Sequence, residues 1–353
     1  MSEKDTELTG VKEIARRANV SIGTVDRVIH DRKGVSQKTK DKINAIIQEL
    51  DYQPNIFARR LASKKQLKFA VLIPKVSAET DYWEAPLLGI AQASTEISPY
   101  GIEVENYLYD LNDKNSFLQQ IGKIDLSEIQ GVLLAPIFIE ESEHFLRKLE
   151  RIKIPYVFIN SDIQEHNSLS YIGPNLYQSG YLSAHLMKYL VKKEETILIV
   201  NISHEIDNQH HLLRKEQGFR NYFLDNHLDN PIIKLDIKKT DFSFVSSALS
   251  KLLKTEQVGA IFVTNSRVST VAKYLKKNET QRPIVIGFDY TKDNISYLKE
   301  GIIDFLICQK PREQGYKGII ALYQNIVHGK TAEKNTFMPI DIITTENCDF
   351  YVN

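Results

Sequence analysis

Apolar residues in the first fifty positions recur at helical spacing in three short segments. Apolar positions 11, 14, 15 and 18 predict a helix over 11–18, and positions 25, 28 and 29 predict a second over 22–29. Positions 43, 46, 47 and 50 form the apolar face of a third helix, which begins after Ser36 and reaches about Leu50. Ser21 and Ser36 stand directly before the second and third helices, where a hydroxyl can accept hydrogen bonds from free amides. Two short helices, a tight turn and a supporting helix predict an all-α helix-turn-helix unit.

From Phe69 onward, apolar runs of strand length alternate with helical segments. The predicted strands cover 69–74, 102–109, 131–137, 156–160, 196–201, 232–237, 260–264, 283–288 and 305–308, and the helices include 86–97, 115–121, 177–191, 215–225, 244–253 and 312–328. This alternation predicts doubly wound parallel sheets. Nine strands over about 285 residues are too many for one compact sheet, so a body of two α/β lobes is expected. Ligands of such sheets bind at the carboxyl ends of the strands, which here means the cleft between the lobes.

The composition is that of an ordinary globular chain. The 353 residues are 42% hydrophobic and 25% charged, and no apolar run is long enough to cross a membrane. The polar first ten residues lack the apolar core of a signal peptide, so we expect a cytoplasmic protein without a membrane partner. The two cysteines, Cys308 and Cys348, are too few for a disulfide framework or a cysteine-based zinc site.

The charge is balanced overall but unevenly distributed. The chain holds 45 basic and 45 acidic residues, yet residues 8–65 alone hold thirteen basic and six acidic ones. That segment therefore carries a net charge of +7, and the rest of the chain carries −7. A basic end joined to an acidic body indicates a nucleic-acid surface, although a solvated charged helix face would produce the same count.

The stretch TGVKEIARRANVSIGTVDRVIHDRKGVSQKTKDKINAIIQELDYQPNIFARRLASKK closely resembles the DNA-binding headpiece of the lac-repressor (LacI/GalR) family. The resemblance implies a helix-turn-helix domain over 8–54 that binds double-stranded operator DNA. It places Ile22, Gly23 and Arg27 at base-reading positions of the second helix, and Ser21 and Thr24 at phosphates. Arg27 is the strongest candidate for reading a base, because a guanidinium can bond guanine O6 and N7 together.

The recognition helix departs from the family pattern at three positions. Ile22 and Gly23 replace larger polar residues, so they either contact a thymine methyl group or leave the site less discriminating. Asp26 replaces a small hydroxyl residue, and a carboxylate near phosphates is repulsive. Asp26 therefore either faces away from DNA or pairs with a neighbouring arginine.

Residues 55–66 resemble the family's hinge helix. Asn55 follows the helix-stopping Pro54 and is a suitable N-cap. The resemblance implies that this segment folds when two subunits meet at the operator, with Leu61 wedged into the minor groove, Ala58 on the groove floor and Arg59 near phosphates. A simple linker is the alternative.

Residues 67–353 resemble the two-lobed effector-binding and dimerisation domain of this family, a periplasmic-binding-protein-like fold of the ribose-binding type. Polar and aromatic residues at strand ends carry the match, and the resemblance implies that they bind a small carbohydrate-like effector: Tyr82, Trp83, Asn160, Ser161, Asn265, Asp289 and Gln309. The family's pocket arginine aligns with Lys215, and the adjacent Arg214 preserves its charge if the alignment shifts by one residue. Ser266 and Arg267 replace the usual acidic residue. These departures leave the ligand open and would permit an acidic sugar.

The resemblance implies a homodimeric transcriptional regulator of carbohydrate-utilisation genes, by default a repressor released by its effector. No cofactor is expected. Enzyme motifs such as GxSxG, HExxH, a Gly-rich phosphate loop and CxxC are absent from the sequence. Histidines at 204, 210 and 211 near Glu205 and Asp207 fit solvent or the cleft rim better than a metal. Two alternatives remain open: a body that senses a protein cofactor or a non-sugar ligand, and a sugar-processing enzyme with an appended headpiece.

Overall fold

A computed structural model describes residues 11–29, 32–50, 66–77, 80–204, 210–278 and 282–352. The chain separates into two compact units, Met1–Lys65 and Gln66–Asn353. The first unit, here called the headpiece, and the second, here called the body, are each described by themselves.

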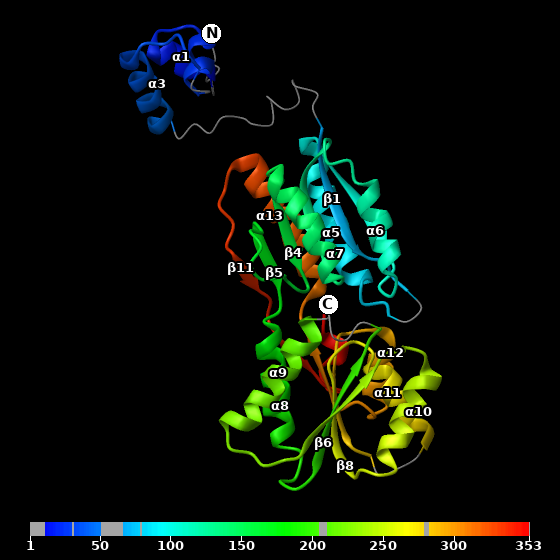
Figure 1. Cartoon of the computed structure of the whole chain (residues 1–353). Helices are drawn as coiled ribbons and strands as arrows, with labels where there is room; N and C mark the ends of the chain where they lie inside the picture. Colours follow the sequence, from blue (N-terminus) through cyan, green and yellow to red (C-terminus); the bar gives the residue numbers. More distant parts are fainter. Residues whose placement is uncertain are drawn as a thin grey trace, which may run out of the picture. The chain divides into compact units, whose positions relative to one another are not determined.

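The headpiece contains three short helices packed around one small core (Figure 1). The helices are α1 (Val11–Ala18), α2 (Ile22–Ile29) and α3 (Gln37–Glu49). Their buried residues are Ile14, Ala15, Ala18, Val25, Val28, Ile43 and Ile46. Ser36 Oγ caps α3 by accepting a hydrogen bond from the amide of Thr39 at 3.3 Å, and Ser21 Oγ accepts from the amide of Thr24 at 3.2 Å. The helical periods and both serine caps predicted from the sequence are confirmed.

The first lobe of the body, lobe 1, is built on a six-stranded parallel sheet in the order β11-β5-β4-β3-β1-β2. Its strands are β1 (Leu67–Pro74), β2 (Ile102–Tyr109), β3 (Ile129–Leu134), β4 (Tyr156–Ile159), β5 (Ser170–Gly173) and β11 (Asn335–Phe337). Its helices are α5 (Glu84–Ile97), α6 (Lys114–Lys123), α7 (Ile139–Arg151) and the late helix α13 (Pro311–His328). Helix α13, orange in Figure 1, returns to this lobe and packs along α5.

The second lobe, lobe 2, repeats the design with the sheet order β12-β10-β9-β8-β6-β7. Its strands are β6 (Thr196–Ile202), β7 (Ile232–Ile237), β8 (Val258–Val263), β9 (Ile284–Phe288), β10 (Phe305–Cys308) and the antiparallel edge strand β12 (Asp341–Ile343). Its helices are α8 (Leu176–Lys188), α9 (His210–Asp225), α10 (Phe242–Leu253), α11 (Val268–Asn278) and α12 (Lys292–Lys299).

Successive residues of strand β6 lie on opposite faces of this sheet. Ile197 and Ile199 of β6 pack into the cluster that contains α8 and α9, whereas Leu198 and Val200 pack into the cluster that contains α10, α11 and α12. Because side chains alternate along a strand, a run that is apolar at every position must be covered on both sides. This is the doubly wound arrangement that the sequence predicted.

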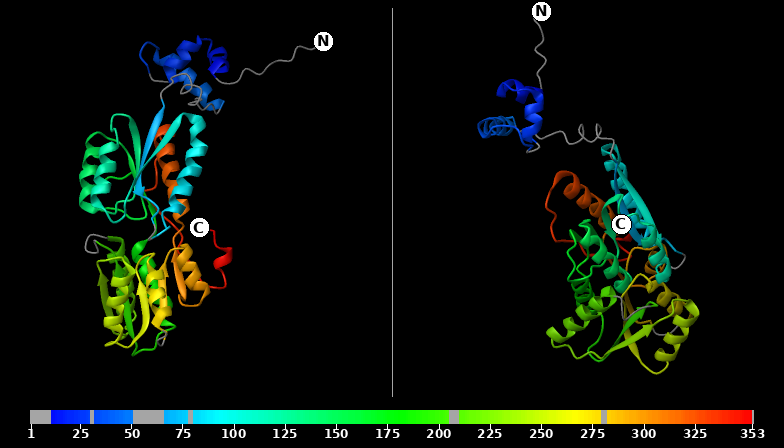
Figure 2. Two further views of the ribbon diagram at one scale, coloured as in Figure 1. Left: turned by 90° about the vertical axis from the view of Figure 1, so that its right-hand side faces the viewer. Right: turned by 45° about the horizontal axis from the view of Figure 1, so that its top comes forward.

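Three crossings of the chain join the lobes. Residues 174–175 connect β5 to α8, residues 309–310 connect β10 to α13, and residues 338–340 connect β11 to β12. The two lobes and the crossing chains can be followed from two further directions in Figure 2. All nine predicted strands are present within a few residues of their expected bounds, while β5, β11 and β12 were not predicted.

Helices α8 and α9 of lobe 2 approach closely because glycines face the partner backbone. A Cβ atom on Gly180 would overlap the carbonyl of Lys215, and one on Gly218 would overlap the carbonyl of Tyr177. The two glycines therefore let the helices touch through their backbones. This close packing fixes the position of α9, and with it the position of Lys215.

Substituting Gly218 tests this close contact. Gly218→Ala should lower the stability by about 1–3 kcal/mol, because an added methyl group in packed surroundings forces the helices apart. Gly122→Ala in α6 is the matched control, since nothing lies within 4 Å of its added Cβ and alanine favours a helix. Thermal melting should show a lower midpoint for Gly218→Ala alone, and equal midpoints for the two variants would contradict the packing argument.

Candidate functional site

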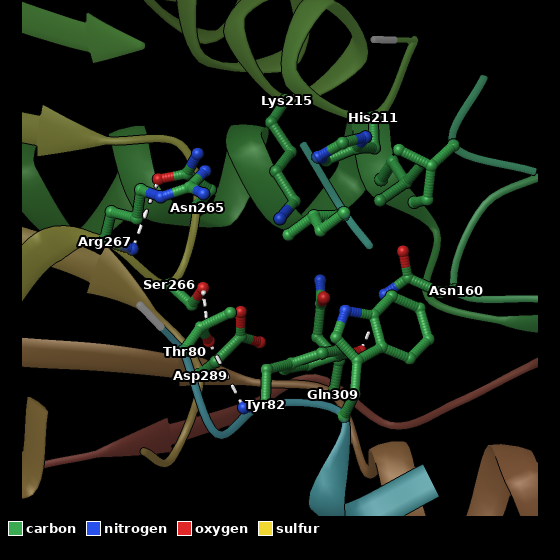
Figure 3. A pocket seen from close by; sticks show the side chains of 14 residues that line it. Thr80, Tyr82, Asn160, His211, Lys215, Asn265, Ser266, Arg267, Asp289 and Gln309 are labelled. Carbon is green, nitrogen blue, oxygen red and sulfur yellow. Dashed lines mark hydrogen bonds between the residues drawn. The ribbon is translucent and has the colours of Figure 1, made fainter. Parts of the chain in front are cut away.

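A pocket lies where the carboxyl ends of the strands of the two lobes meet (Figure 3). Its cavity volume is about 60 Å³, which is below the usual range for small-molecule sites, so a ligand the size of a sugar needs the lobes to move apart to enter. Its lining comes from both lobes: Thr80, Tyr82, Trp83, Leu111, Ile137, Asn160, Leu176, His211, Lys215, Asn265, Ser266, Arg267, Asp289 and Gln309.

The first polar residues that follow two buried strands lie in this pocket. Asn160 follows β4 and Asp289 follows β9, and both adopt left-handed backbone conformations with φ of 69° and 74°. Asn and Asp tolerate this region better than other side chains except glycine. Each strand therefore ends in a sharp change of direction at the pocket wall.

An aromatic pair forms the lobe 1 wall of the pocket. The rings of Tyr82 and Trp83 meet edge to face with centroids 5.1 Å apart, and Trp83 is only 3% exposed. Asn160 Nδ2 donates to the hydroxyl oxygen of Tyr82 at 2.6 Å, which holds the aromatic loop against the end of β4. Burial raises the pKa of Tyr82 far above its usual value. Tyr82 is therefore a neutral hydroxyl group at physiological pH.

The ammonium group of Lys215 and the carboxylate of Asp289, both from lobe 2, lie in the pocket wall. Lys215 is 4% exposed, and its Nζ donates to the carbonyl of Thr264 at 3.2 Å and lies 3.6 Å from the centre of the Phe288 ring. Burial lowers the pKa of Lys215 to about 8, partly offset by the charge of Asp289. Burial raises the pKa of Asp289 to about 6, and the charge of Lys215 limits this rise. Both groups remain ionised at neutral pH at a cost in desolvation free energy.

Arg267 and Asn265 complete this wall. Arg267 donates from Nη1 to the carbonyl of Ile202 at 3.2 Å and from Nη2 to Asn112 Oδ1 at 3.3 Å. Asn265 Nδ2 donates to the same carbonyl at 2.8 Å, and its Oδ1 accepts from the amide of Arg267 at 3.2 Å. These bonds fix the loop after β8 in one conformation.

Two glutamines tie the pocket to the second crossing between the lobes. Gln314 Nε2 donates to the carbonyl of Gln309 at 2.8 Å, and Gln314 Oε1 accepts from the amide of Asn160 at 3.0 Å. Gln309 is 2% exposed, and its Nε2 has no hydrogen-bond partner among the described residues. An unpaired buried amide is costly, so Gln309 has a donor available for a bound molecule.

Polar contacts between the lobes surround the pocket. Thr80 Oγ1 lies 3.3 Å from Ser266 Oγ, and the amide of Lys292 donates to Asp81 Oδ2 at 3.2 Å. Further bridges join Arg267 to Asn112, Arg214 to Asp162 at 3.2 Å, and Lys292 to Glu84 at 3.4 Å. Single hydrogen bonds and partly exposed ion pairs each contribute about 1 kcal/mol to stability. The lobes are therefore joined by contacts that can be broken individually at low cost.

The pocket contains most of the effector residues predicted from the sequence. Tyr82, Trp83, Asn160, Lys215, Asn265, Asp289 and Gln309 all line it, but Ser161 and Arg214 do not. Ser161 is buried beside the turn, where its amide donates to the carbonyl of Ile159, and Arg214 pairs instead with Asp162. Of the two adjacent basic residues, the structure thus brings Lys215 to the pocket. The sequence analysis assigned His211 to solvent or the cleft rim, and it lines the pocket. It did not propose Thr80, Leu111, Ile137 or Leu176, which come from loops and a helix start without a motif of their own.

His211 lines the pocket as a neutral imidazole. Although part of the ring is accessible, desolvation and the nearby charges of Lys215 and Arg267 lower the pKa of His211 to about 3. His204 Nε2 lies 3.3 Å from Thr240 Oγ1. Glu205 and Asp207 lie outside the described residues, and within the described part of the chain no three metal-ligating side chains gather.

The headpiece presents most of its predicted DNA-contacting residues on one helix. Ser21, Gly23 and Arg27 are exposed, Thr24 is half-buried, and Ile22 is 51% exposed, which is unusual for an isoleucine on so short a helix. Asp26 forms an ion pair with Arg32 at 3.2 Å, which is the pairing alternative considered for this departure from the family pattern. Asn55, Ala58, Arg59 and Leu61 of the predicted hinge lie outside the described residues.

The headpiece and the two-lobed body together define a DNA-binding transcriptional regulator that carries a periplasmic-binding-protein-like domain. Residues 10–55 match the family model for bacterial regulatory proteins of the lacI family, and residues 69–331 match a periplasmic binding protein domain. The chain belongs to the lacI family of bacterial regulatory proteins. Among the described residues, no helix has the length and apolar character needed to span a bilayer.

Relatives and solved structures agree with this assignment. The HTH-type transcriptional regulator RegA of Clostridium acetobutylicum is 25% identical over 96% of this chain and 98% of its own length. The crystal structure of a proposed LacI transcriptional regulator from Bacteroides fragilis is 30% identical, with a TM-score of 0.75 over 82% of this chain and 100% of that chain. GanP, a glucose-galactose binding protein from Geobacillus stearothermophilus, shares the fold at 21% identity and a TM-score of 0.70, covering 80% of this chain and 98% of its own. The family members matched here are named as transcriptional regulators and not as enzymes.

The raised pKa of Asp289 predicts how stability depends on pH. An unfolded aspartate titrates near 3.8 and Asp289 near 6, so the folded protein bears the cost of a buried carboxylate above pH 6 and is free of it below pH 4. Asp289→Asn should therefore be more stable than the parent chain at pH 8, by about 1–3 kcal/mol, and the difference should shrink toward pH 4.

Melting midpoints between pH 4 and pH 8 measure this difference. Asp229→Asn is the matched control, because this aspartate is exposed in a loop and does not line the pocket. If Asp289→Asn is instead less stable than the parent chain at pH 8, the favourable contacts of the Asp289 carboxylate outweigh the cost of its desolvation, and the argument from burial is wrong.

Proposed function

We propose that this chain is a homodimeric repressor of carbohydrate-utilisation genes that binds an operator through the headpiece and releases it when a sugar or sugar derivative occupies the body. The domain assignment is 8–54 for DNA reading, 55–66 for the hinge and 67–353 for effector binding and dimerisation. Such a regulator acts in the cytoplasm, beside the chromosome.

One observation carries the sugar assignment: the pocket combines an indole face with a ring of hydroxyl, amide and carboxylate groups. Trp83 offers a flat surface of the kind that packs on the C–H face of a pyranose or furanose ring. Asn160, Asn265 and Gln309 each present an amide, which can donate to and accept from hydroxyl groups, and Asp289 can accept from two. A polyol with hydroxyl groups on every side can satisfy all of these partners at once.

The DNA assignment depends on the exposed side of α2. The helix buries Val25 and Val28 in the headpiece core and leaves Ser21, Gly23 and Arg27 exposed. The pairing of Asp26 with Arg32 supports the assignment, since it partly neutralises a carboxylate that would otherwise repel phosphates. A homodimer would present two such helices to a pseudo-palindromic operator.

Closure of the lobes is the step by which ligand binding in the pocket would change the affinity of the headpiece for DNA. A sugar that contacts Trp83 of lobe 1 and Lys215 of lobe 2 binds the closed arrangement more tightly than an open one. The bridges that close the lobes are polar and individually weak, so ligand binding can shift the balance between the two arrangements. The shift in operator affinity is limited by the difference between the affinities of the effector for the two states.

Arg27→Ala tests the reading helix. Selection of binding sites from a random DNA pool first defines the operator, and the variant should then lose about 1–3 kcal/mol of preference for it over random DNA. Lys38→Ala on α3 is the matched control, because it removes one exposed positive charge from the same headpiece. The control should weaken binding to all sequences alike and lower the salt dependence. Unchanged operator preference in Arg27→Ala would place base reading elsewhere.

A screen of monosaccharides and sugar acids tests the body. A true effector at one hundred times its Kd should raise the melting midpoint by roughly 5 °C and should lower the affinity for the selected operator, measured by fluorescence anisotropy. If no sugar stabilises the chain, a protein cofactor or a non-sugar ligand is favoured. Steady chemical turnover of a stabilising sugar would instead support an enzyme.

A further inference from the structure

Lys215 is an ammonium group buried in the pocket that forms no ion pair with a described residue, although the charge of Asp289 acts on it. Its Nζ donates to one backbone carbonyl and lies over the Phe288 ring, and it forms no ion pair with any described residue. An ammonium group has three donors, so the bond to Thr264 leaves hydrogen-bonding capacity on the side that faces the pocket. In Figure 3 the side chain of Lys215 descends from α9 toward the centre of the cavity.

The remaining charges of the described lining add to this positive side. Arg267 is 7% exposed and contributes a second positive charge beside Asn265. Desolvation and the charges of these two cations hold His211 neutral. Asp289 is the carboxylate among the described lining residues, and Figure 3 shows it on the opposite side of the cavity, next to Thr80 and Ser266. The described lining thus places the cations Lys215 and Arg267 opposite the carboxylate of Asp289.

We propose that the effector is a sugar acid whose carboxylate binds Lys215, so that the pocket selects anionic sugars over the neutral sugars of the same ring. This inference rests on the proposed function and names the chemical class of ligand for the same pocket. The carboxylate accepts from Lys215 Nζ, while the hydroxyl groups at the other end of the ring donate to Asp289 and accept from Gln309 Nε2. The ring itself packs on Trp83.

Electrostatics at a desolvated site favours this orientation. A hydrogen bond between two charged groups is about twice as strong as one between neutral groups, and it offsets part of the cost of burying an ammonium group that has no ion pair. A neutral hydroxyl group in the same place pairs with Lys215 but leaves its charge uncompensated. A single carboxylate also matches the single charge of Lys215, whereas a phosphate dianion introduces one negative charge in excess.

Calorimetric titration of the full chain with matched ligands tests the proposal. The probes are D-glucose, D-galactose and D-mannose, the corresponding hexuronates, and the corresponding hexose 6-phosphates. We expect at least one hexuronate to bind about 10-fold or more tightly than its parent hexose, since a decade in Kd corresponds to about 1.4 kcal/mol. Lys215→Met should reduce this acid-to-neutral ratio toward one, and Lys215→Arg should retain most of it.

Arg214→Met is the matched control. It removes a positive charge one residue away, but the side chain of Arg214 pairs with Asp162 across the lobes and does not line the pocket. This variant can weaken all ligands together by destabilising lobe closure, yet it should leave the acid-to-neutral ratio unchanged.

The outcomes separate this inference from the proposed function. Neutral hexoses that bind as tightly as their hexuronates in the parent chain overturn the inference and leave the proposed function standing. Tighter binding of the 6-phosphates than of the hexuronates also overturns it. Binding of no sugar in the panel contradicts both. The comparison in the parent chain requires no variant, so a failure of Lys215→Met to fold does not remove the test.

Discussion

Parallel strands all end at the same edge of a sheet, and this constraint determines where the chemistry of this body can lie. In each lobe the buried strands β1, β3, β4, β8 and β9 are apolar on both faces, so the first polar side chains appear only where the strands stop. Three crossings of the chain join the lobes so that these ends face one another across a single pocket. Asn160 and Asp289 turn sharply in left-handed conformations at this edge and leave their side chains in the pocket. The pocket is therefore a consequence of the sheet topology, and the residue types at the strand ends define what it can bind.

The same arrangement buries charged groups, and their desolvation costs free energy. Lys215 and Asp289 are withdrawn from water, which lowers the pKa of the lysine and raises that of the aspartate. Close packing elsewhere provides the rigidity that holds them there: α9 contacts α8 through glycine and backbone, and Lys215 lies directly on this contact. The contacts that bridge the lobes are polar and partly exposed, in contrast to the apolar cores within each lobe. Two rigid lobes joined by weak bridges form a body in which a ligand can change the population of the closed state.

Much of this structure could be predicted from the sequence, because the strongest signals are local. The helices of the headpiece follow from apolar spacing and serine caps, and the nine strands follow from apolar runs, of which those inside the sheets are covered on both faces while the edge strands β2 and β7 are partly exposed. Strands β5, β11 and β12 escaped prediction because they are only three or four residues long and contain polar residues. Ser161 was expected in the pocket beside Asn160, but the left-handed turn at Asn160 directs the next residue into the protein. Arg214 and Lys215 are neighbours on one helix and project in different directions, so only the packing of α9 decides which of them lines the pocket. The bridges between Thr80 and Ser266 or between Arg267 and Asn112 join residues far apart in the chain, and no local pattern encodes them.

The proposed function depends on one coupling, in which occupation of this pocket changes the affinity of the headpiece for its operator. Trp83 is the single tryptophan of the chain and lies in the pocket wall, so its fluorescence reports occupancy directly. The decisive measurement titrates the protein bound to fluorescently labelled operator with the hexose or hexuronate that binds best, and follows tryptophan emission and operator anisotropy together. The account predicts that both signals change over the same range of ligand concentration, with loss of the operator as the pocket fills. A saturating change in Trp83 emission while the operator stays fully bound would contradict it.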